Sequence, residues 1–123
     1  MRLKQASALA ALTVAAVISV TPSLATAGNP DLCASNKVCI YDDNGYSALL
    51  DVARDPGQGI RNVNAGDNDR MDSWENRTST KSAWYYNADG KGSCVNMNAR
   101  SEDDNINVFD SDELTSWRTN RGC

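Results

Sequence analysis

The sequence predicts a small all-β domain, a sandwich made of two similar antiparallel units. Three observations predict this fold class. No segment after residue 27 has a long apolar repeat of helical period, so long helices are not expected. Asn, Asp, Gly and Ser recur throughout that part of the chain, and these residues typically separate short strands by turns. Finally, two short motifs each occur twice, in the same order.

The first 27 residues have the three-part composition of a secretory signal peptide. Arg2 and Lys4 form a basic start, an apolar run covers residues 8–20, and residues 25–27 supply the small-x-small pattern of a cleavage site. The apolar run is shorter than the roughly 20 residues that a bilayer-spanning helix needs. We therefore expect a cleaved signal peptide, a secreted extracellular protein, and a single mature domain over residues 28–123.

The mature chain is acidic. Without Arg2 and Lys4, ten basic side chains face sixteen acidic ones, a net charge of −6. Such a surface repels nucleic acid and anionic membranes, so neither is expected as a partner. It is compatible with cations, including calcium. We expect the domain to be monomeric.

The four cysteines all lie in the mature part, and an even number in a small exported chain indicates two disulfides. Three pairings are possible. The short separation of Cys33 and Cys39 favours that pair, which leaves Cys94 with Cys123. A zinc site is not expected, because the sequence has no CxxC pair and no histidine.

The internal repeat gives the fold its expected organisation. Residues 41–46 and 86–91 both begin with an aromatic residue, an acid or amide, any residue, an acid or amide, and glycine, at an offset of 45. Their Asn-Gly and Asp-Gly pairs are strong hairpin turns. Residues 68–74 and 111–117 share an Asp, three residues and then Ser-Trp, at an offset of 43. Candidate strands cover residues 37–42, 46–52, 60–63, 82–87, 93–97 and 105–109.

The two copies are expected to form one sandwich. Each copy has an opening hairpin and a later acidic loop that ends in Ser-Trp, and one copy alone could not bury its apolar face. Packed together, the copies would share a core. Trp74 and Trp117 occupy equivalent places, and we expect both to be core residues.

These motifs resemble the βγ-crystallin superfamily, which is built from paired Greek keys. Each key of that family carries an Asn/Asp-Asn/Asp-x-x-Ser/Thr-Ser loop. Residues 68–73 match it except at Asp72, which stands where the family has Ser or Thr, and residues 111–116 match it except at Ser111. The resemblance implies a two-Greek-key βγ-crystallin-like sandwich.

The hairpin motif of the same family is matched more loosely. It expects an aromatic residue, four residues, a second aromatic, one residue and then glycine. The first hairpin has Tyr41 and Tyr46, with Ala48 in place of the glycine. The second departs from the motif at Lys91 and Ser93. A small side chain at residue 48 remains compatible with a tight hairpin.

Within this superfamily the chain is similar to the secreted bacterial proteins grouped with the family I36 peptidase inhibitors. The similarity lies in the opening Cys, five residues, Cys, apolar, Tyr pattern of residues 33–41, and in the Asn-Asp-x-x-x-Ser-Trp-x-Asn string of residues 68–76. It implies a secreted inhibitor of extracellular proteases, most of all metalloproteinases. The expected partner is therefore an extracellular protease.

The resemblance also implies an inhibitory bond. Inhibitors of this kind present a rigid segment to the protease cleft, since rigidity lowers the ordering cost of binding. The inhibitors that this chain resembles present a Cys-Val bond, and thermolysin-type proteases favour an apolar residue just after the scissile bond. Cys94-Val95 supplies both features, and its cysteine is disulfide-bonded in the expected pairing. The competing interpretation is that Cys94 only forms a structural disulfide and that Val95 is a strand residue of the core.

The alternative function is a calcium-binding module with a structural or stress-related extracellular role. Calcium prefers carboxylate, amide and hydroxyl oxygens, and the two acidic loops contain all three. The resemblance implies calcium as the cofactor, held in one loop by Asn68, Asp69, Asp72 and Ser73 and in the other by Asp112, Thr115 and Ser116. The competing interpretation is that both loops are solvated turns with local backbone hydrogen bonds.

An enzyme is not expected. Without histidine, the Ser-His and Cys-His arrangements of nucleophilic catalysis are absent. The carboxylates of residues 102–104 resemble a glycosidase pair only in composition, and a run of this kind in a small acidic domain is usually a solvated loop.

Overall fold

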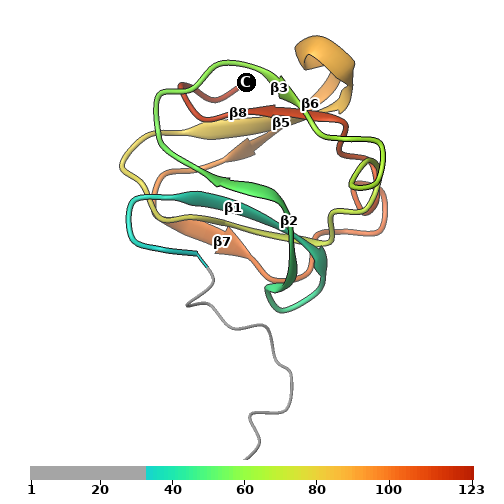
Figure 1. The fold of residues 1–123 in the computed structure, drawn as a ribbon, viewed down its shortest axis with the longest axis horizontal. Helices are drawn as coiled ribbons and strands as arrows, with labels where there is room; N and C mark the ends of the chain where they lie inside the picture. Colours follow the sequence, from blue (N-terminus) through green and yellow to red (C-terminus); the bar gives the residue numbers. More distant parts are fainter. Residues whose placement is uncertain (1–32) are drawn as a thin grey trace, which may run out of the picture.

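The computed structural model of the chain describes residues 33–123, which form two four-stranded antiparallel sheets packed face to face (Figure 1). The expected all-β sandwich is therefore confirmed, whereas the expected signal peptide lies outside the described residues. Among these residues, no helix is long and apolar enough to cross a membrane. The strands are β1 (Val38–Asp43), β2 (Ser47–Arg54), β3 (Arg61–Asn62), β4 (Ser73–Asn76), β5 (Ser82–Asn87), β6 (Lys91–Met97), β7 (Ser101–Asp103) and β8 (Ser116–Arg118), with a short turn η2 (Ala88–Gly90) after β5.

The two sheets exchange one strand. Strand β1 pairs with β2 and β4, and β5 pairs in the same way with β6 and β8. The third strand of each unit crosses to the other sheet, so that β3 lies beside β8 and β7 lies beside β4. Each unit is thus a Greek key that completes its partner's sheet. In this arrangement neither unit forms a complete sheet from its own strands alone.

The two hairpins are equivalent at an offset of 44 residues, one less than the offset of 45 expected from the sequence, because β1 and β5 begin at residues 38 and 82 and the pairs Asp43–Ser47 and Asn87–Lys91 close them. Ala48 and Gly92 stand at equivalent places just after the turns, and both have left-handed backbone, with φ of 58° and 76°. The glycine that the hairpin motif requires is therefore present in the second unit, one residue before Ser93. In the first unit an alanine adopts the same conformation, which is strained for a residue with a Cβ.

The core lies between the sheets. Trp74 is 6% exposed and Trp117 is fully buried, which places both tryptophans in the core as expected. A second, smaller cluster surrounds the Cys33–Cys39 disulfide and contains Tyr41. The main cluster consists of Val38, Ile40, Leu50, Val63, Met71, Trp74, Trp84, Met97, Ile106, Leu114 and Trp117.

Three short strands were missed by the sequence analysis, and one expected strand was wrong. Strands β4, β7 and β8 have only three or four residues each, which is too short for an alternating pattern to be visible. The expected strand at residues 105–109 is instead a bend followed by a turn. The turn forms because the Asn107 side-chain oxygen accepts hydrogen bonds from the main-chain amides of Phe109 and Asp110.

Two disulfides close the described part of the chain, and they have the pairing that the cysteine spacing favoured. Cys33–Cys39 closes the loop that leads into β1. Cys94–Cys123 joins β6 to the last residue of the chain. No free cysteine remains among residues 33–123.

Candidate functional site

The two acidic loops lie side by side and are joined by a reciprocal pair of main-chain hydrogen bonds. The Asp69 amide donates to the Leu114 carbonyl at 2.9 Å, and the Asp112 amide donates to the Met71 carbonyl at 3.1 Å. Asp69 and Asp112 are equivalent in the repeat, and both have left-handed backbone, with φ of 56° and 61°. The loops therefore form one continuous acidic surface related by the internal repeat.

The side chains of the loops also pair across the repeat. The Ser111 hydroxyl donates to the carboxylate of Asp72. In the other cluster, the Thr115 hydroxyl lies 3.4 Å from a carboxylate oxygen of Asp69. Each oxygen cluster thus combines the start of one loop with the end of the other, whereas the sequence analysis grouped the candidate ligands loop by loop.

Ser73 and Ser116 have a structural role in this arrangement. The Ser73 hydroxyl donates to the Asp43 carbonyl at 2.6 Å and accepts the Tyr46 amide at 3.2 Å. The Ser116 hydroxyl makes the same two bonds, to the Asn87 carbonyl at 2.6 Å and from the Gly90 amide at 3.0 Å. Both serines are fully buried. They join each acidic loop to the opening hairpin of its own unit.

Like charges crowd around Asp112. Burial raises the pKa of its carboxyl group above the ordinary value, and nearby carboxylates raise it further. The Arg70 guanidinium pairs with one of them, that of Asp42, and acts on the pKa of Asp112 in the opposite direction. The carboxylates that raise it are Asp72, Asp42 and Asp69.

The loops offer oxygen donors of the kind that calcium prefers, in limited number. The Asn68 side-chain oxygen is buried and accepts no hydrogen bond from the described residues. No group of three or more His, Cys, Asp and Glu side chains within residues 33–123 is placed to hold a metal ion. The donors are of the type that a hard cation binds, and hydroxyl and main-chain oxygens would have to complete its coordination.

The Cys94-Val95 bond lies within β6, an edge strand. Cys94 is opposite Tyr85 and Val95 is opposite Trp84, while the other side of β6 has no neighbour in the sheet. Both residues are half-buried, and the Val95 side chain packs against the main core. The disulfide to Cys123 ties this edge to the chain terminus. The segment therefore offers main-chain groups to a partner more readily than the valine side chain.

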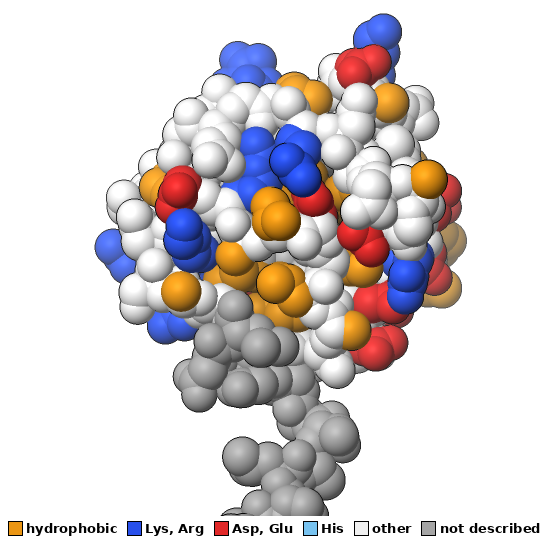
Figure 2. Space-filling model, in the orientation of Figure 1, with side chains coloured by type: hydrophobic (Ala, Val, Ile, Leu, Met, Phe, Trp, Pro, Cys, Tyr) orange, Lys and Arg blue, Asp and Glu red, His pale blue; other side chains and the backbone are white. Residues whose placement is uncertain are grey.

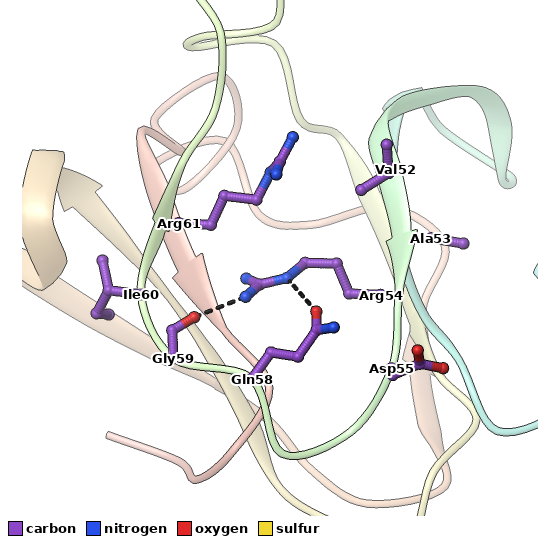
Figure 3. A pocket seen from close by; sticks show the side chains of 8 residues that line it. All are labelled: Val52, Ala53, Arg54, Asp55, Gln58, Gly59, Ile60 and Arg61. Carbon is purple, nitrogen blue, oxygen red and sulfur yellow. Dashed lines mark hydrogen bonds between the residues drawn. The ribbon is translucent and has the colours of Figure 1, made fainter.

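A pocket of about 470 Å³ opens between β2 and the segment that follows it (Figure 3). Arg54 crosses it and is only 5% exposed. Its guanidinium donates to carbonyls of Gly59 and Trp117, at 2.6 and 2.8 Å, and to the Gln58 side chain at 3.1 Å. It also lies 4.7 Å from the centre of the Trp117 ring. Hydrophobic and basic side chains lie next to each other on the face seen in Figure 2. Through its hydrogen bond to the Trp117 carbonyl and its contact with the Trp117 ring, Arg54 connects β2 to β8.

An exposed turn was missed by the sequence analysis. Val108 and Phe109 are 81% and 82% exposed and follow Asn107, which closes the turn. Both residues lie in the segment 105–109, for which the sequence predicted a strand. The signal that could have identified the turn is the pair Asn107 and Asp110, because Asn and Asp three residues apart favour a turn closed by side-chain hydrogen bonds.

The strand exchange and the paired loops define a βγ-crystallin fold. The chain is similar to a βγ-crystallin domain from Flavobacterium johnsoniae, with 19% identity and a TM-score of 0.54 over 66% of this chain and 90% of that one. It is similar to a βγ-crystallin domain from Clostridium beijerinckii, with 18% identity and a TM-score of 0.53 over 67% and 94%. A structure described under the evolution of the eye lens βγ-crystallin domain fold has 18% identity and a TM-score of 0.56 over 75% and 89%.

A comparison with family models assigns the chain to a narrower group than its fold does. Residues 26–97, more than half of the chain, match the model of peptidase inhibitor family I36. The chain belongs to this family, and it is an inhibitor-family protein and not an enzyme. A search of curated proteins found no match.

Proposed function

We propose that this domain is a secreted inhibitor of extracellular metalloproteinases and that strand β6 contacts the protease at the Cys94-Val95 bond. Membership in family I36 supports the inhibitor function. The observation that carries the choice of β6 is its position: it is an edge strand tied down by the Cys94–Cys123 disulfide. The two disulfides are consistent with an extracellular location.

Strand β6 suits a protease cleft for two physical reasons. An exposed sheet edge carries main-chain donors and acceptors that can pair with another extended chain. The disulfide and the pairing with β5 hold this edge in one conformation, so that little order has to be gained on binding. The protease binds a rigid segment of this kind in its cleft but cleaves it slowly.

The test is inhibition by the purified domain of residues 28–123. We expect inhibition of thermolysin, with weaker or no inhibition of serine and cysteine proteases in the same screen. Val95→Asp should abolish inhibition if the bond is the contact. Because Val95 packs against the core, near-UV circular dichroism must show that this variant folds. Val95→Thr, which keeps the branched shape, should weaken inhibition less.

Two results would contradict the proposal. Absence of inhibition by the wild-type domain against all three protease classes would contradict the inhibitor function. Undiminished inhibition by a folded Val95→Asp variant would exclude the Cys94-Val95 bond and leave the inhibitor function in place.

Calcium binding is the second candidate function. The unpartnered oxygen of Asn68 and the crowded carboxylates around Asp112 favour it. A bound cation would relieve the repulsion between these carboxylates. The contact of Ser111 with Asp72 and the crowding of Asp112 against Asp72 suggest one site at Asp72, Ser111 and Asp112. The contact of Thr115 with Asp69 suggests a second site.

A thermal melt with calcium and with chelator tests this candidate. Calcium at one hundred times its Kd should stabilise the domain by about 2.7 kcal/mol. Asp112→Asn should remove part of this shift and should raise the melting temperature without calcium, because it removes one of the crowded charges. Asp55→Asn, at an exposed carboxylate that pairs with Lys37, is the control. No shift at millimolar calcium would contradict calcium binding.

A further inference from the structure

We infer that the Val108-Phe109 turn is the element whose side chains enter an apolar subsite of the target metalloproteinase. This inference rests on the proposed inhibition and adds a second contact to that of strand β6. The turn lies outside residues 26–97, the part of the chain that matches the family, so the family likeness does not assign it.

The first observation is exposure. Val108 and Phe109 are 81% and 82% exposed, while the other large exposed hydrophobic side chains among residues 33–123 are between 38% and 46% exposed. A phenylalanine in this position contributes almost nothing to the core. Aromatic side chains contribute most strongly to protein interfaces when they become buried there.

The second observation is rigidity within the turn. The Asn107 side-chain oxygen accepts the amides of Phe109 and Asp110 at 3.0 and 3.2 Å. Its side-chain nitrogen donates to the Asp110 carboxylate at 2.6 Å. The Asn107 carbonyl accepts the amides of Asp110 and Ser111 at 3.0 and 2.9 Å. These hydrogen bonds hold the backbone of the turn in one conformation, from which its two apolar side chains project.

The third observation is attachment of the turn to the core. The Tyr86 hydroxyl lies 3.0 Å from the main-chain carbonyl oxygen of Phe109 and also contacts the Asp110 carboxylate. Ile106 precedes the turn and Leu114 follows it, and both are buried in the main core. A turn held at both ends and at its centre loses little entropy when it binds, as an inhibitory segment requires.

The charge around the turn indicates the kind of partner. Residues 101–117 contain six carboxylates and no basic side chain. Two copies of this surface would repel each other, so self-association through the turn is disfavoured. The turn instead fits a partner with an apolar subsite and a neutral or basic rim. Thermolysin-type proteases favour an apolar residue beside the scissile bond, and Val95 turns its side chain to the core.

The experiment compares inhibition constants toward thermolysin for the wild-type domain and three variants. Phe109→Ser should raise the inhibition constant at least about 30-fold, the effect of losing a dominant interface side chain. Phe109→Leu, which keeps an apolar side chain, should restore most of the inhibition. Val52→Ser changes another exposed apolar residue and should leave inhibition unchanged. The positions are exposed, so all three variants should fold.

The outcomes separate this inference from the proposed function. Wild-type inhibition that Phe109→Ser leaves unchanged would overturn the inference and leave the inhibitor function standing. No inhibition by the wild-type domain would overturn both. A wild-type dimer in sedimentation that Phe109→Ser dissociates, with unchanged inhibition, would also overturn the inference by showing that the turn binds a second copy.

Discussion

The Tyr86 hydroxyl lies 3.0 Å from the main-chain carbonyl oxygen of Phe109, and the Tyr86 ring stacks on that of Trp84 with centroids 5.6 Å apart. Trp84 is fully buried in the core. A single tyrosine therefore connects the most exposed aromatic side chain of the described residues to the interior of the sandwich. This connection explains how an exposed turn can hold one conformation.

Replacing Tyr86 by Phe should loosen the turn without disturbing the core. The ring and its stacking on Trp84 remain, while the hydroxyl contacts with Phe109 and Asp110 are lost. We expect the free energy of unfolding to fall by about 1 kcal/mol. The amides of Phe109 and Asp110 should exchange faster with solvent, as measured by NMR. Unchanged exchange would show that Asn107 alone holds the turn.

Replacing Ala48 by Gly should stabilise the domain. Ala48 has φ of 58°, a conformation that costs an L-residue about 1 kcal/mol and that glycine adopts freely. Part of this gain is offset because glycine also makes the unfolded chain more flexible, so we expect a net gain of about 0.5 kcal/mol in urea unfolding. The matched control is Ala53→Gly in the same strand, which should be destabilising. Equal effects at both positions would contradict the strain at Ala48.

Removing either buried serine hydroxyl should destabilise the domain to a similar extent. Ser73→Ala and Ser116→Ala each remove a donor to a hairpin carbonyl and leave a hairpin amide without its acceptor. We expect a loss of about 1 to 3 kcal/mol for each, measured by denaturant unfolding. Ser79→Ala, at an exposed position, should change stability by less than about 0.5 kcal/mol. A large difference between the two buried serines would contradict their equivalence.

Glu75 should make the domain less stable as the pH rises. Burial raises the pKa of its carboxyl group above the ordinary value of 4.5, although the Tyr41 hydroxyl donates a hydrogen bond to it at 2.8 Å. A raised pKa means that the folded state binds the proton more tightly, so this stability is fully present below pH 4.5 and is lost as the pH rises through the raised pKa of the folded state. Glu75→Gln keeps an oxygen acceptor for Tyr41 and removes the charge.

The measurement is urea unfolding of the wild type and Glu75→Gln at pH 4 and pH 7. The variant should gain stability relative to the wild type as the pH increases. A stability difference that is the same at both pH values, or that falls toward pH 7, would show that burial does not control the ionisation of Glu75.

The repeat made much of the fold predictable. Strand β5 has the bounds expected for it, residues 82–87, and the strands of the first hairpin begin and end within two residues of expectation. Turn residues and alternating side chains are local signals, and both hairpins contain them. The Ser-Trp motif was visible as well, yet the strands that begin at Ser73 and Ser116 were not, since each has at most four residues.

The sequence by itself determined that two related units exist, where their hairpins turn and which tryptophans anchor the core, because these properties depend on residues close together in the chain. Only the tertiary structure decided that β3 and β7 change sheets, that Asp72 meets Ser111 in the other loop, and that Phe109 is exposed. These relationships arise when two faces pack against each other. An apolar residue has the same identity in a buried strand and in an exposed turn, and the fold decides which of the two it occupies.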